Sequence, residues 1–464
     1  VERCFLFAPF SLYLGRMLSK NIKKIYLIGI KGTGMSSLAV LLKKLGYQVS
    51  GSDTAEKFFT ETQLKNSKIP YTEGFSAGHI KKAKPDLVIT STAYNERNPE
   101  IAEAKILRSR MMSYPEAVGA ISRQLISIAV CGSHGKTTTT SMLGWIMQSN
   151  GATSVLTGTV ADDITKNNHG KPSFFVFEAD EYQNKLQHYS PAAVILTNID
   201  YDHPDYFKNK TSYLAVFKEF TEKILKQGGF VLYCAEDKLT SKLLRGKPNT
   251  HSYGFSKRAD YRIELGKKKD FTIRQNGDHL ADIKLSVFGN HNILNATAAA
   301  VMAMRFGIPP DATAGRLASF KGVKRRMELV PSKKYTIIDD YGHHPTEIRA
   351  TLSAIREQNP KAHITAVFHP HTFTRTKALI KDFGKAFKDA NLTLVLDIYP
   401  SARETASGIH SEDVVRELAK NKAKAVYTPS IPDAAAYIKH HIPKGSIVVT
   451  IGAGNVWQLC ELIK

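Results

Sequence analysis

The sequence predicts an α/β protein built on parallel sheets, and three observations indicate this fold class. Apolar runs of strand length alternate with amphipathic stretches of helix length along almost the whole chain. This alternation restarts three times, at residues 23–30, 125–140 and 335–345. Several apolar runs end in Gly, Asp or His, residue types that suit ligand sites at the carboxyl ends of parallel strands. We therefore expect three α/β segments, with boundaries near residues 120 and 330.

Each segment contains further predicted strands in chain order. In the first, the strand at 23–30 passes through a Gly-rich turn into a helix, and the segment continues with strands at 47–53 and 85–92. In the second, strands at 174–181 and 192–203 follow the opening run. Residues 230–290 differ, because short alternating runs separated by turns predict a small antiparallel subsheet. In the third, strands are expected at 364–372, 392–400 and 446–454.

Composition excludes several classes of protein. The chain has 464 residues, 42% of them hydrophobic, which is enough for two to four packed domains and excludes a disordered chain. Its four cysteines are scattered, so neither a disulfide framework nor a zinc site is expected, and a reducing compartment such as the cytoplasm fits. The net charge of +22 favours anionic partners. Because the lysines are spread along the chain, we expect no nucleic-acid partner.

Residues 1–21 form an unusual start. The apolar run at 5–14 has the length of a signal peptide but is followed by no small-residue cleavage site, and it is too short to span a membrane. We expect Met17 to be the true beginning and predict no membrane insertion.

The strongest local signal is a phosphate-binding loop at Gly132-Ser133-His134-Gly135-Lys136-Thr137-Thr138. It follows an apolar strand and precedes a helical run, and such a loop needs this context because N–H groups at a helix start point toward the anion. Lys136 would reach the β- and γ-phosphates of a nucleotide, and Thr137 would ligate Mg²⁺. Val130 occupies the place of one usual glycine, so an ordinary Gly-rich turn is the alternative.

Acidic and His residues end the next two strands. Glu178 begins a four-residue segment with three acidic residues, which suits Mg²⁺, a cation that prefers oxygen ligands, and a solvated acidic loop is the alternative. His203 ends the run 192–203 and is either a metal ligand or an ordinary loop histidine.

A second glycine loop follows the first strand at Gly29, Gly32, Thr33 and Gly34. It resembles a dinucleotide-binding turn with shifted glycine spacing, and Asp53 stands where a ribose-binding acid would lie. The loop equally suits the diphosphate of a UDP-sugar, because a helix start recognises phosphate charge and not the base. Two such loops in separate segments indicate two phosphorylated substrates.

Polar residues follow other predicted elements. Asn292 and Asn295 share one face of a helix start, where they bind a base or cap the helix. Arg325 and Arg326 either neutralise a transferring phosphoryl group or are solvated. Two strand ends rich in His and Arg predict a carboxylate site, with solvated loop charge as the alternative; they carry Asp340, His343, His344, His369, His371 and Arg375.

Eleven strings of residues occur in the order typical of the Mur ligase family, which the chain resembles from about residue 22 onward. These strings are GIKGTGMS, GSD, GSHGKTTTT, EADE, TNIDYDH, HNILNA, KRRME, DDYGHHPTE, FHPHTFTRT, DIYPSARE and GAGN. GIKGTGMS, HPHTFTRT and IYPSARE are most similar to the branch that adds L-alanine. The resemblance implies a cytoplasmic ligase that uses ATP and Mg²⁺ to join the lactyl carboxylate of UDP-N-acetylmuramate to L-alanine through an acyl phosphate. It leaves monomer and homodimer open.

The resemblance also implies three domains: a Rossmann-like UDP-sugar domain (22–120), a P-loop-type ATPase domain (121–329) and a Rossmann-like amino-acid domain (330–464). By motif, Lys136 contacts the ATP phosphates, Thr137 binds one Mg²⁺, and Glu178 and His203 hold a second. The remaining implied contacts are adenine for Asn292 and Asn295, phosphate for Arg326, ribose for Asp340, and lactyl carboxylate and alanine for Tyr341, His343, His371 and Arg375.

Some residues depart from the family pattern. Lys31 stands where many relatives have Gly and is expected to add a diphosphate contact. Thr372 replaces an arginine, and His369 replaces a common Gln. Lys218 lies near where some siblings carry a carbamylated lysine, but nothing in the sequence assigns that modification to it.

Three other functions remain as alternatives. A related ligase with another acceptor, such as a murein peptide or folate, keeps the same chemistry. The interpretation as an oxidoreductase is based on the glycine loop at residues 29–34, and it leaves the loop at residues 132–138 unexplained. A nucleic-acid-binding module rests on the charge and predicts steep salt dependence.

Overall fold

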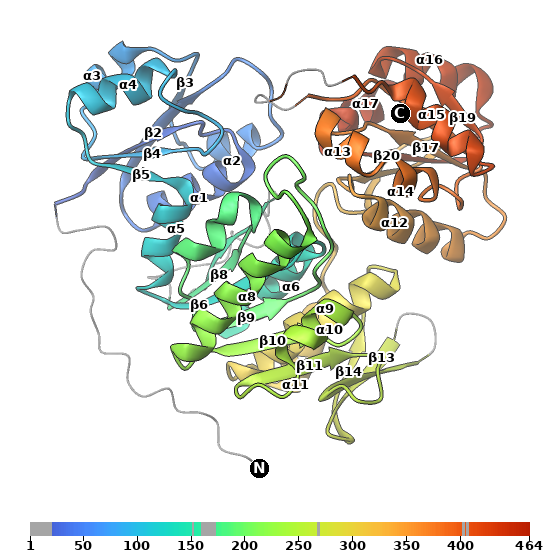
Figure 1. The fold of residues 1–464 in the computed structure, drawn as a ribbon, viewed down its shortest axis with the longest axis horizontal. Coiled ribbons are helices and arrows are strands. Elements are labelled where there is room, and N and C mark those ends of the chain that lie inside the picture. Colours follow the sequence, from blue (N-terminus) through green and yellow to red (C-terminus); the bar gives the residue numbers. More distant parts are fainter. Residues whose placement is uncertain (1–20, 151–152, 159–172, 267–269, 401–403, 405–407) are drawn as a thin grey trace. The chain divides into compact units, whose positions relative to one another are not determined.

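The computed structural model describes residues 21–150, 153–158, 173–266, 270–400, 404 and 408–464, so the predicted N-terminal extension lies largely outside the described residues. The chain is α/β throughout and contains three sheets (Figure 1). It divides into two compact units. The first unit comprises Val1–Asp200, Leu214–Ser286 and Leu294–Phe320, and the second comprises Tyr201–Tyr213, Val287–Ile293 and Lys321–Lys464. Within the described residues, no helix is long and apolar enough to cross a membrane.

The first sheet has five parallel strands in the order β3-β2-β1-β4-β5. This order is that of a Rossmann-like domain. Its strands are β1 (Lys24–Ile28), β2 (Gln48–Asp53), β3 (Tyr71–Glu73), β4 (Leu87–Thr90) and β5 (Met111–Ser113). The helices between and after them are α1 (Thr33–Lys44), α2 (Glu61–Asn66), α3 (Ala77–Ala83), α4 (Pro99–Ile106) and α5 (Tyr114–Ser122). The near-continuous apolar strands β1 and β4 are buried because helices cover both faces of a parallel sheet.

The central sheet has nine strands in the order β14-β13-β12-β11-β10-β9-β6-β8-β7. Its strands are β6 (Ile126–Cys131), β7 (Thr153–Leu156), β8 (Phe174–Glu178), β9 (Ala193–Leu196), β10 (Phe230–Cys234), β11 (Thr250–Gly254), β12 (Tyr261–Leu265), β13 (Asp270–Gln275) and β14 (Asp278–Lys284). The helices of this part are α6 (Lys136–Met147), η1 (Gln148–Asn150), η2 (Tyr182–His188), α8 (Lys210–Lys226), α9 (Lys238–Leu244), α10 (Asn290–Arg305) and α11 (Pro310–Ala318). Because β6, β8 and β9 are parallel neighbours, their carboxyl ends lie at one edge of the sheet.

The third sheet lies in the second unit and has the order β15-β16-β20-β17-β18-β19. Its strands are β15 (Glu328–Val330), β16 (Thr336–Asp340), β17 (Ile364–Phe368), β18 (Leu392–Val395), β19 (Ala425–Tyr427) and β20 (Ile447–Ile451). Its helices are α12 (Pro345–Gln358), α13 (Phe373–Ala378), α14 (Ile380–Gly384), α15 (Ser411–Lys420), α16 (Ile431–His441), η3 (Val456–Gln458) and α17 (Leu459–Ile463). Among the described strands of this sheet, β15 is antiparallel to its neighbour and the others are parallel. Apolar cores cover both faces, so loops at the strand ends are left for chemistry.

The predicted fold class is confirmed. The alternating runs of residues 230–290 do form antiparallel strands, since β12, β13 and β14 pair in that sense. They extend the edge of the central sheet, because β12 pairs in parallel with β11, β11 with β10 and β10 with β9. The boundaries near 120 and 330 stay predictions.

Candidate active site

The loop between β6 and α6 has the backbone of a phosphate-binding turn. Gly132 and Gly135 have φ angles of +126° and +79°, a conformation that residues with side chains rarely adopt. A Cβ atom on Gly132 would lie 2.2 Å from Oγ1 of Thr197, and one on Gly135 would lie 2.6 Å from Oδ1 of Asn295. Both glycines are therefore required by conformation and by space, and Asn295 is placed beside the loop.

Residues that follow β9 hold this loop in place. The His134 backbone N–H donates to Oδ1 of Asn198 at 2.9 Å, and Thr197 Oγ1 donates to the His134 carbonyl at 2.6 Å. Ser133 Oγ donates to the Asp200 carbonyl at 2.7 Å, and the His134 ring lies 3.0 Å from the Asp200 carboxylate. The loop is therefore fixed by side chains from a neighbouring strand end before any ligand arrives.

Lys136, whose side chain is 12% exposed, lies against acidic residues. Its Nζ donates to the Gly132 carbonyl at 2.6 Å and lies 3.0 Å from Oε2 of Glu181. Burial alone would lower the pKa of Lys136, but the carboxylates of Glu181, Asp180 and Glu178 outweigh it and raise that pKa. Lys136 is therefore a fixed cation at neutral pH, folded back over the loop that would cradle phosphate.

Thr137 and Glu178 meet beside Lys136. Thr137 Oγ1 donates to Oε2 of Glu178 at 2.9 Å, and the Gly158 N–H donates to the same oxygen at 2.8 Å. Two hard oxygen donors at this separation fit Mg²⁺, which binds through few protein ligands and keeps the rest for water and phosphate. His203 belongs to the second unit, so its expected pairing with Glu178 stays a prediction.

Thr138 follows in the first turn of α6 and is half-buried. Asn292 and Asn295, both 7% exposed, lie near the start of α10. Asn292 Nδ2 donates to the Phe288 carbonyl at 2.9 Å, so one of its groups shapes the approach to the helix. Their predicted contact with adenine stays a prediction.

The loop after β1 needs its glycines in the same way. Gly29 has φ +83°, and a Cβ there would lie 2.7 Å from the ring of Tyr94. A Cβ on Gly34, in α1, would lie 2.7 Å from the ring of Tyr114. Gly32 and Thr33 lie between them and open the helix, with Gly32 as its N-cap. The loop thus brings bare backbone to the start of α1, as diphosphate binding requires.

Asp53 lies at the end of β2 as predicted, but its carboxylate is engaged internally. It accepts hydrogen bonds from the N–H of Lys31 at 2.6 Å and of Thr54 at 2.8 Å, and from the Tyr94 hydroxyl at 3.0 Å. Burial raises the pKa of Asp53 despite these bonds, and the residue is 2% exposed. Asp53 therefore holds the glycine loop, and its contact with a ribose stays a prediction.

The prediction that Lys31 contacts a diphosphate is wrong. Its side chain is fully buried, and Nζ lies 2.9 Å from Glu73, 3.4 Å from Glu61 and 3.0 Å from the Thr54 carbonyl. Glu73 and Glu61 together outweigh burial and raise the pKa of Lys31. The ammonium group therefore links α2 and β3 to the loop and faces carboxylates. These carboxylates belong to residues outside the motif around Lys31, so the motif could not predict them.

Replacing Lys31 with methionine is expected to lower stability and leave UDP-sugar affinity within about twofold. Removing one partner of a buried charge pair costs about 3–5 kcal/mol, and partial exposure of Glu73 places this pair at or below the lower value. Urea unfolding and calorimetric titration with the UDP-sugar would separate the two effects. Lys65→Met is the control, since Lys65 also pairs with Glu61 but is exposed. A large loss of affinity with unchanged stability would contradict this assignment.

In the second unit, charged side chains gather around Asp202. Its carboxylate, 4% exposed, accepts a hydrogen bond from Nε of Arg375 at 2.8 Å. The other guanidinium nitrogens of Arg375 lie 3.2 Å from Nδ1 of His371 and 3.4 Å from Nδ1 of His203. His343 lies 3.9 Å from the same carboxylate. The structure therefore brings together His203, His343, His371 and Arg375, which are spread over 173 positions of sequence.

The electrostatics of this cluster keep the rings of His343 and His371 neutral. Burial, aided by the charge of Arg375, lowers the pKa of His343 to about 4 and holds that of His371 well below its ordinary value. Burial opposes ionisation of Asp202, but Arg375 outweighs it and keeps the pKa of this carboxyl well below 3.8. Neutral imidazoles can accept hydrogen bonds from an amine, and a fixed guanidinium beside them can orient a carboxylate. Tyr341, whose ring lies 5.6 Å from that of His343, borders the cluster.

Arg325 and Arg326 differ in role. Arg325 is 6% exposed, bonds to Asp339 at 3.2 Å and donates to the Gly452 carbonyl at 2.7 Å, so it ties the segment to the sheet. Arg326 lies 5.0 Å from the centre of the Tyr341 ring and remains the candidate for phosphate.

Asp340, at the end of β16, is buried and internally bonded. It accepts hydrogen bonds from the N–H of Met327 at 2.9 Å and of Gly342 at 2.8 Å. Burial raises the pKa of Asp340 to about 6, although Arg326 lowers it. Its predicted ribose contact stays a prediction, and in this structure it fixes the loop that carries Tyr341 and His343.

A cavity of about 460 Å³ lies at the carboxyl ends of β17 and β18, and the sequence does not predict it. Its wall is mostly apolar and includes Leu396, Ile398 and Tyr399. Two buried polar atoms on lining residues, Nδ1 of His369 and Oδ1 of Asn455, have no hydrogen-bond partner among the described residues. An apolar cavity with a few polar atoms is the usual form of a small-molecule site. The one sequence signal for the burial of His369 is the apolar run that precedes it.

His369→Gln is expected to reduce acid sensitivity. Burial lowers the pKa of His369 to about 4, so its neutral form contributes fully above pH 6.5. Below pH 6.5, His369 becomes protonated in the unfolded chain before it does so in the folded protein. The free energy of unfolding therefore decreases as the pH falls toward 4, by about 2 kcal/mol at pH 5. Urea unfolding at pH 7.5 and 5 should therefore show a smaller difference for the variant. The exposed His440→Gln should behave as wild type, and an unchanged pH difference in His369→Gln would contradict the prediction.

Comparisons with known proteins identify the class to which these sites belong. Three family models match: the Mur ligase family catalytic domain over residues 24–125, the Mur ligase middle domain over 130–303 and the Mur ligase glutamate ligase domain over 325–454. The chain belongs to the Mur ligase family, whose members are ATP-dependent ligases.

Within that family the similarity runs over almost the full length. A UDP-N-acetylmuramate–L-alanine ligase of Desulfitobacterium hafniense is 36% identical and covers 94% of this chain and 98% of its own. One from Lactobacillus acidophilus is 37% identical, covering 95% and 98%. Among solved structures, a UDP-N-acetylmuramate–alanine ligase from Thermotoga maritima has a TM-score of 0.80, 27% identity and coverage of 95% and 98%. A murein peptide ligase from Psychrobacter arcticus has a TM-score of 0.71, 25% identity and the same coverage.

Proposed function

We propose that this protein joins L-alanine to the lactyl carboxylate of UDP-N-acetylmuramate, with ATP converted to ADP and phosphate, in peptidoglycan synthesis. The observation that carries the proposal is the near-complete match to curated relatives with that activity in their names, at 36–37% identity. The loop around Lys136 supports it, because the loop supplies a fixed cation and bare backbone for a nucleotide's phosphates.

The chemistry requires activation of the carboxylate. A carboxylate does not react usefully with an amine at neutral pH, since oxide would have to leave. Transfer of the terminal phosphoryl group gives an acyl phosphate, from which the amine of alanine displaces phosphate. For the first step the protein positions groups and offsets charge. We assign this role to Lys136 and Arg326, with the backbone of Gly132, Ser133, His134, Gly135 and Thr138 around the phosphates.

The oxygen atoms of Thr137 and Glu178 fit Mg²⁺, and we propose that Thr137 holds one ion and that Glu178, with His203, holds a second. When bound, the ions neutralise charge on the phosphates. The remaining residues would hold substrates: Gly29, Gly32, Thr33, Gly34 and Asp53 near the UDP-sugar; Asn292, Asn295 and Asp340 near the nucleoside; and Tyr341, His343, His371 and Arg375 near the lactyl carboxylate and alanine. We place the enzyme in the cytoplasm, as a monomer or homodimer without a nucleic-acid partner.

Phosphate release from ATP with UDP-N-acetylmuramate and single amino acids tests the function. L-alanine should support turnover at least tenfold better than serine or glycine. The alternative is a ligase that accepts a murein peptide, which the similarity to the Psychrobacter arcticus protein favours. Turnover with a murein tripeptide and none with L-alanine would replace the proposal with this alternative.

A further inference from the structure

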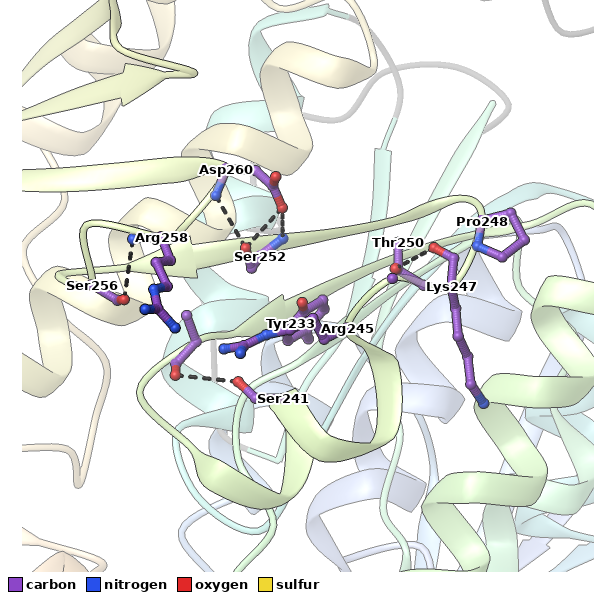
Figure 2. Close-up of a pocket in the computed structure, with 12 residues that line it drawn as sticks. Tyr233, Ser241, Arg245, Lys247, Pro248, Thr250, Ser252, Ser256, Arg258 and Asp260 are labelled. Carbon is purple, nitrogen blue, oxygen red and sulfur yellow. Dashed lines mark hydrogen bonds between the residues drawn. The ribbon is translucent and has the colours of Figure 1, made fainter.

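A polar cavity of about 470 Å³ lies beside α9 in the first unit. Its lining comes from β10, α9, the turn after α9, β11 and the turn before β12 (Figure 2). None of the residues proposed for ATP, Mg²⁺ or substrates lines it. In the sheet, β11 lies three strands from β6, or about 14 Å at the usual spacing of about 4.8 Å. The cavity is therefore distinct from the loop that carries Lys136.

Two arginines dominate its charge. Arg245 follows α9 and Arg258 lies in the turn before β12, and Figure 2 shows both guanidinium groups turned into the same space near Ser241. Among the residues that the structure describes, neither arginine forms an ion pair. Lys247, the third cation of the lining, is instead directed to Glu222 at 3.3 Å. Like charges facing one another repel, whereas a dianion placed between them would attract both.

The acidic residues nearby are already engaged. Oδ2 of Asp260, the only carboxylate of the lining, accepts hydrogen bonds from the N–H and the hydroxyl of Ser252, both at 2.7 Å. Glu236, next to the cavity, accepts one from the Ser256 N–H at 2.8 Å. Neither acid is directed at a guanidinium group, so the cavity keeps a net positive wall.

Hydroxyl groups complete the wall. Tyr233 is 4% exposed, and the side chains of Ser252 and Arg245 lie within hydrogen-bonding reach of its hydroxyl. Ser241 Oγ donates to the Ala235 carbonyl at 3.3 Å, which leaves its lone pairs as acceptors for a ligand. No aromatic face is open here among the lining residues, which argues against a stacked base. The lining thus suits a charged group attached to a hydroxyl-rich body.

We propose that this cavity binds a phosphate monoester with a polyhydroxylated body, such as a sugar phosphate. The two guanidinium groups recognise the dianionic phosphate, since a guanidinium offers paired donors to phosphate oxygens. The serine hydroxyls and backbone carbonyls of the wall hold the sugar hydroxyls. A volume of about 470 Å³ lies within the range of small-ligand sites.

Calorimetric titration with ribose 5-phosphate tests this proposal, with ribose as the uncharged counterpart. Wild type should bind ribose 5-phosphate and not ribose. Arg245→Ala and Arg258→Ala should each weaken binding about tenfold, equivalent to about 1.4 kcal/mol. Lys257→Ala is the matched control, because Lys257 is an exposed cation adjacent to Arg258 that does not line the cavity. It should bind as wild type.

The Lys136→Ala variant tests whether binding occurs at this cavity or at the nucleotide loop. Lys136→Ala should bind ribose 5-phosphate as tightly as wild type does, whether or not the protein turns over ATP. The proposal is overturned if wild type does not bind ribose 5-phosphate, if the arginine variants, folded by circular dichroism, bind as wild type, or if Lys136→Ala abolishes binding. Because the readout is binding, its failure is separate from any failure of the ligase assay.

Discussion

Replacing Lys136 with alanine is expected to lower phosphate release by about 10²–10³-fold, equivalent to about 3–4 kcal/mol of barrier. The variant loses a cation that the structure holds against the loop carbonyls and that remains protonated because of Glu181, Asp180 and Glu178. It also leaves these three carboxylates without their shared counter-ion, so phosphate oxygens would meet uncompensated negative charge. Affinity for the UDP-sugar should stay within about twofold, since the glycine loop after β1 does not involve Lys136.

Lys185→Ala is the matched control for this prediction. Lys185 also pairs with an acid of the same group, Asp180, at 2.5 Å, but it lies outside the phosphate loop. Its removal should change phosphate release by less than about tenfold. Circular dichroism would show that both variants fold. Equal losses in the two variants would mean that charge balance alone matters, and lost UDP-sugar affinity in Lys136→Ala would show that the loop has been assigned to the wrong substrate.

The parts of the site that sequence predicts well are those set by local pattern. Glycines with positive φ, such as Gly132 and Gly135, follow a strand and precede a helix, and the chemistry of such a turn depends on neighbours in sequence. Strands ending in Glu178 and Asp340 are also local patterns, because parallel strands place their carboxyl ends at one edge. These predictions need only periodicity and residue type.

Partners distant in sequence could not be predicted. Lys31 was expected to face a diphosphate, yet its ammonium meets Glu61 and Glu73, which lie 30 and more positions away. Asp202 was not singled out, although it accepts the hydrogen bond of Arg375 from 173 positions away. Which carboxylate compensates which cation depends on packing of whole elements, and a single sequence does not specify that geometry.

Arg375→Ala should lower the free energy of unfolding of the second unit by about 3–5 kcal/mol, the usual cost of leaving a buried charge without its partner. Arg375 and Asp202 are each 4% exposed, and Nε of Arg375 lies 2.8 Å from Oδ1 of Asp202. The nearby imidazole of His371 has a low pKa, so it stays neutral and cannot replace the positive charge of Arg375. Turnover should fall as well, because His371 and His203 lose the guanidinium that contacts them. Urea unfolding near pH 7.5 measures the stability change.

A double-mutant cycle decides whether this loss belongs to the pair. Asp202→Asn alone should also destabilise, because Arg375 then remains buried without a counter-charge. Combining Asp202→Asn with Arg375→Ala removes both charges, so the double variant should be more stable than the sum of the single losses predicts, by more than about 1 kcal/mol. Its turnover should not recover, since substrate orientation needs the guanidinium itself. Additive losses would instead mean that Asp202 and Arg375 stabilise the unit separately.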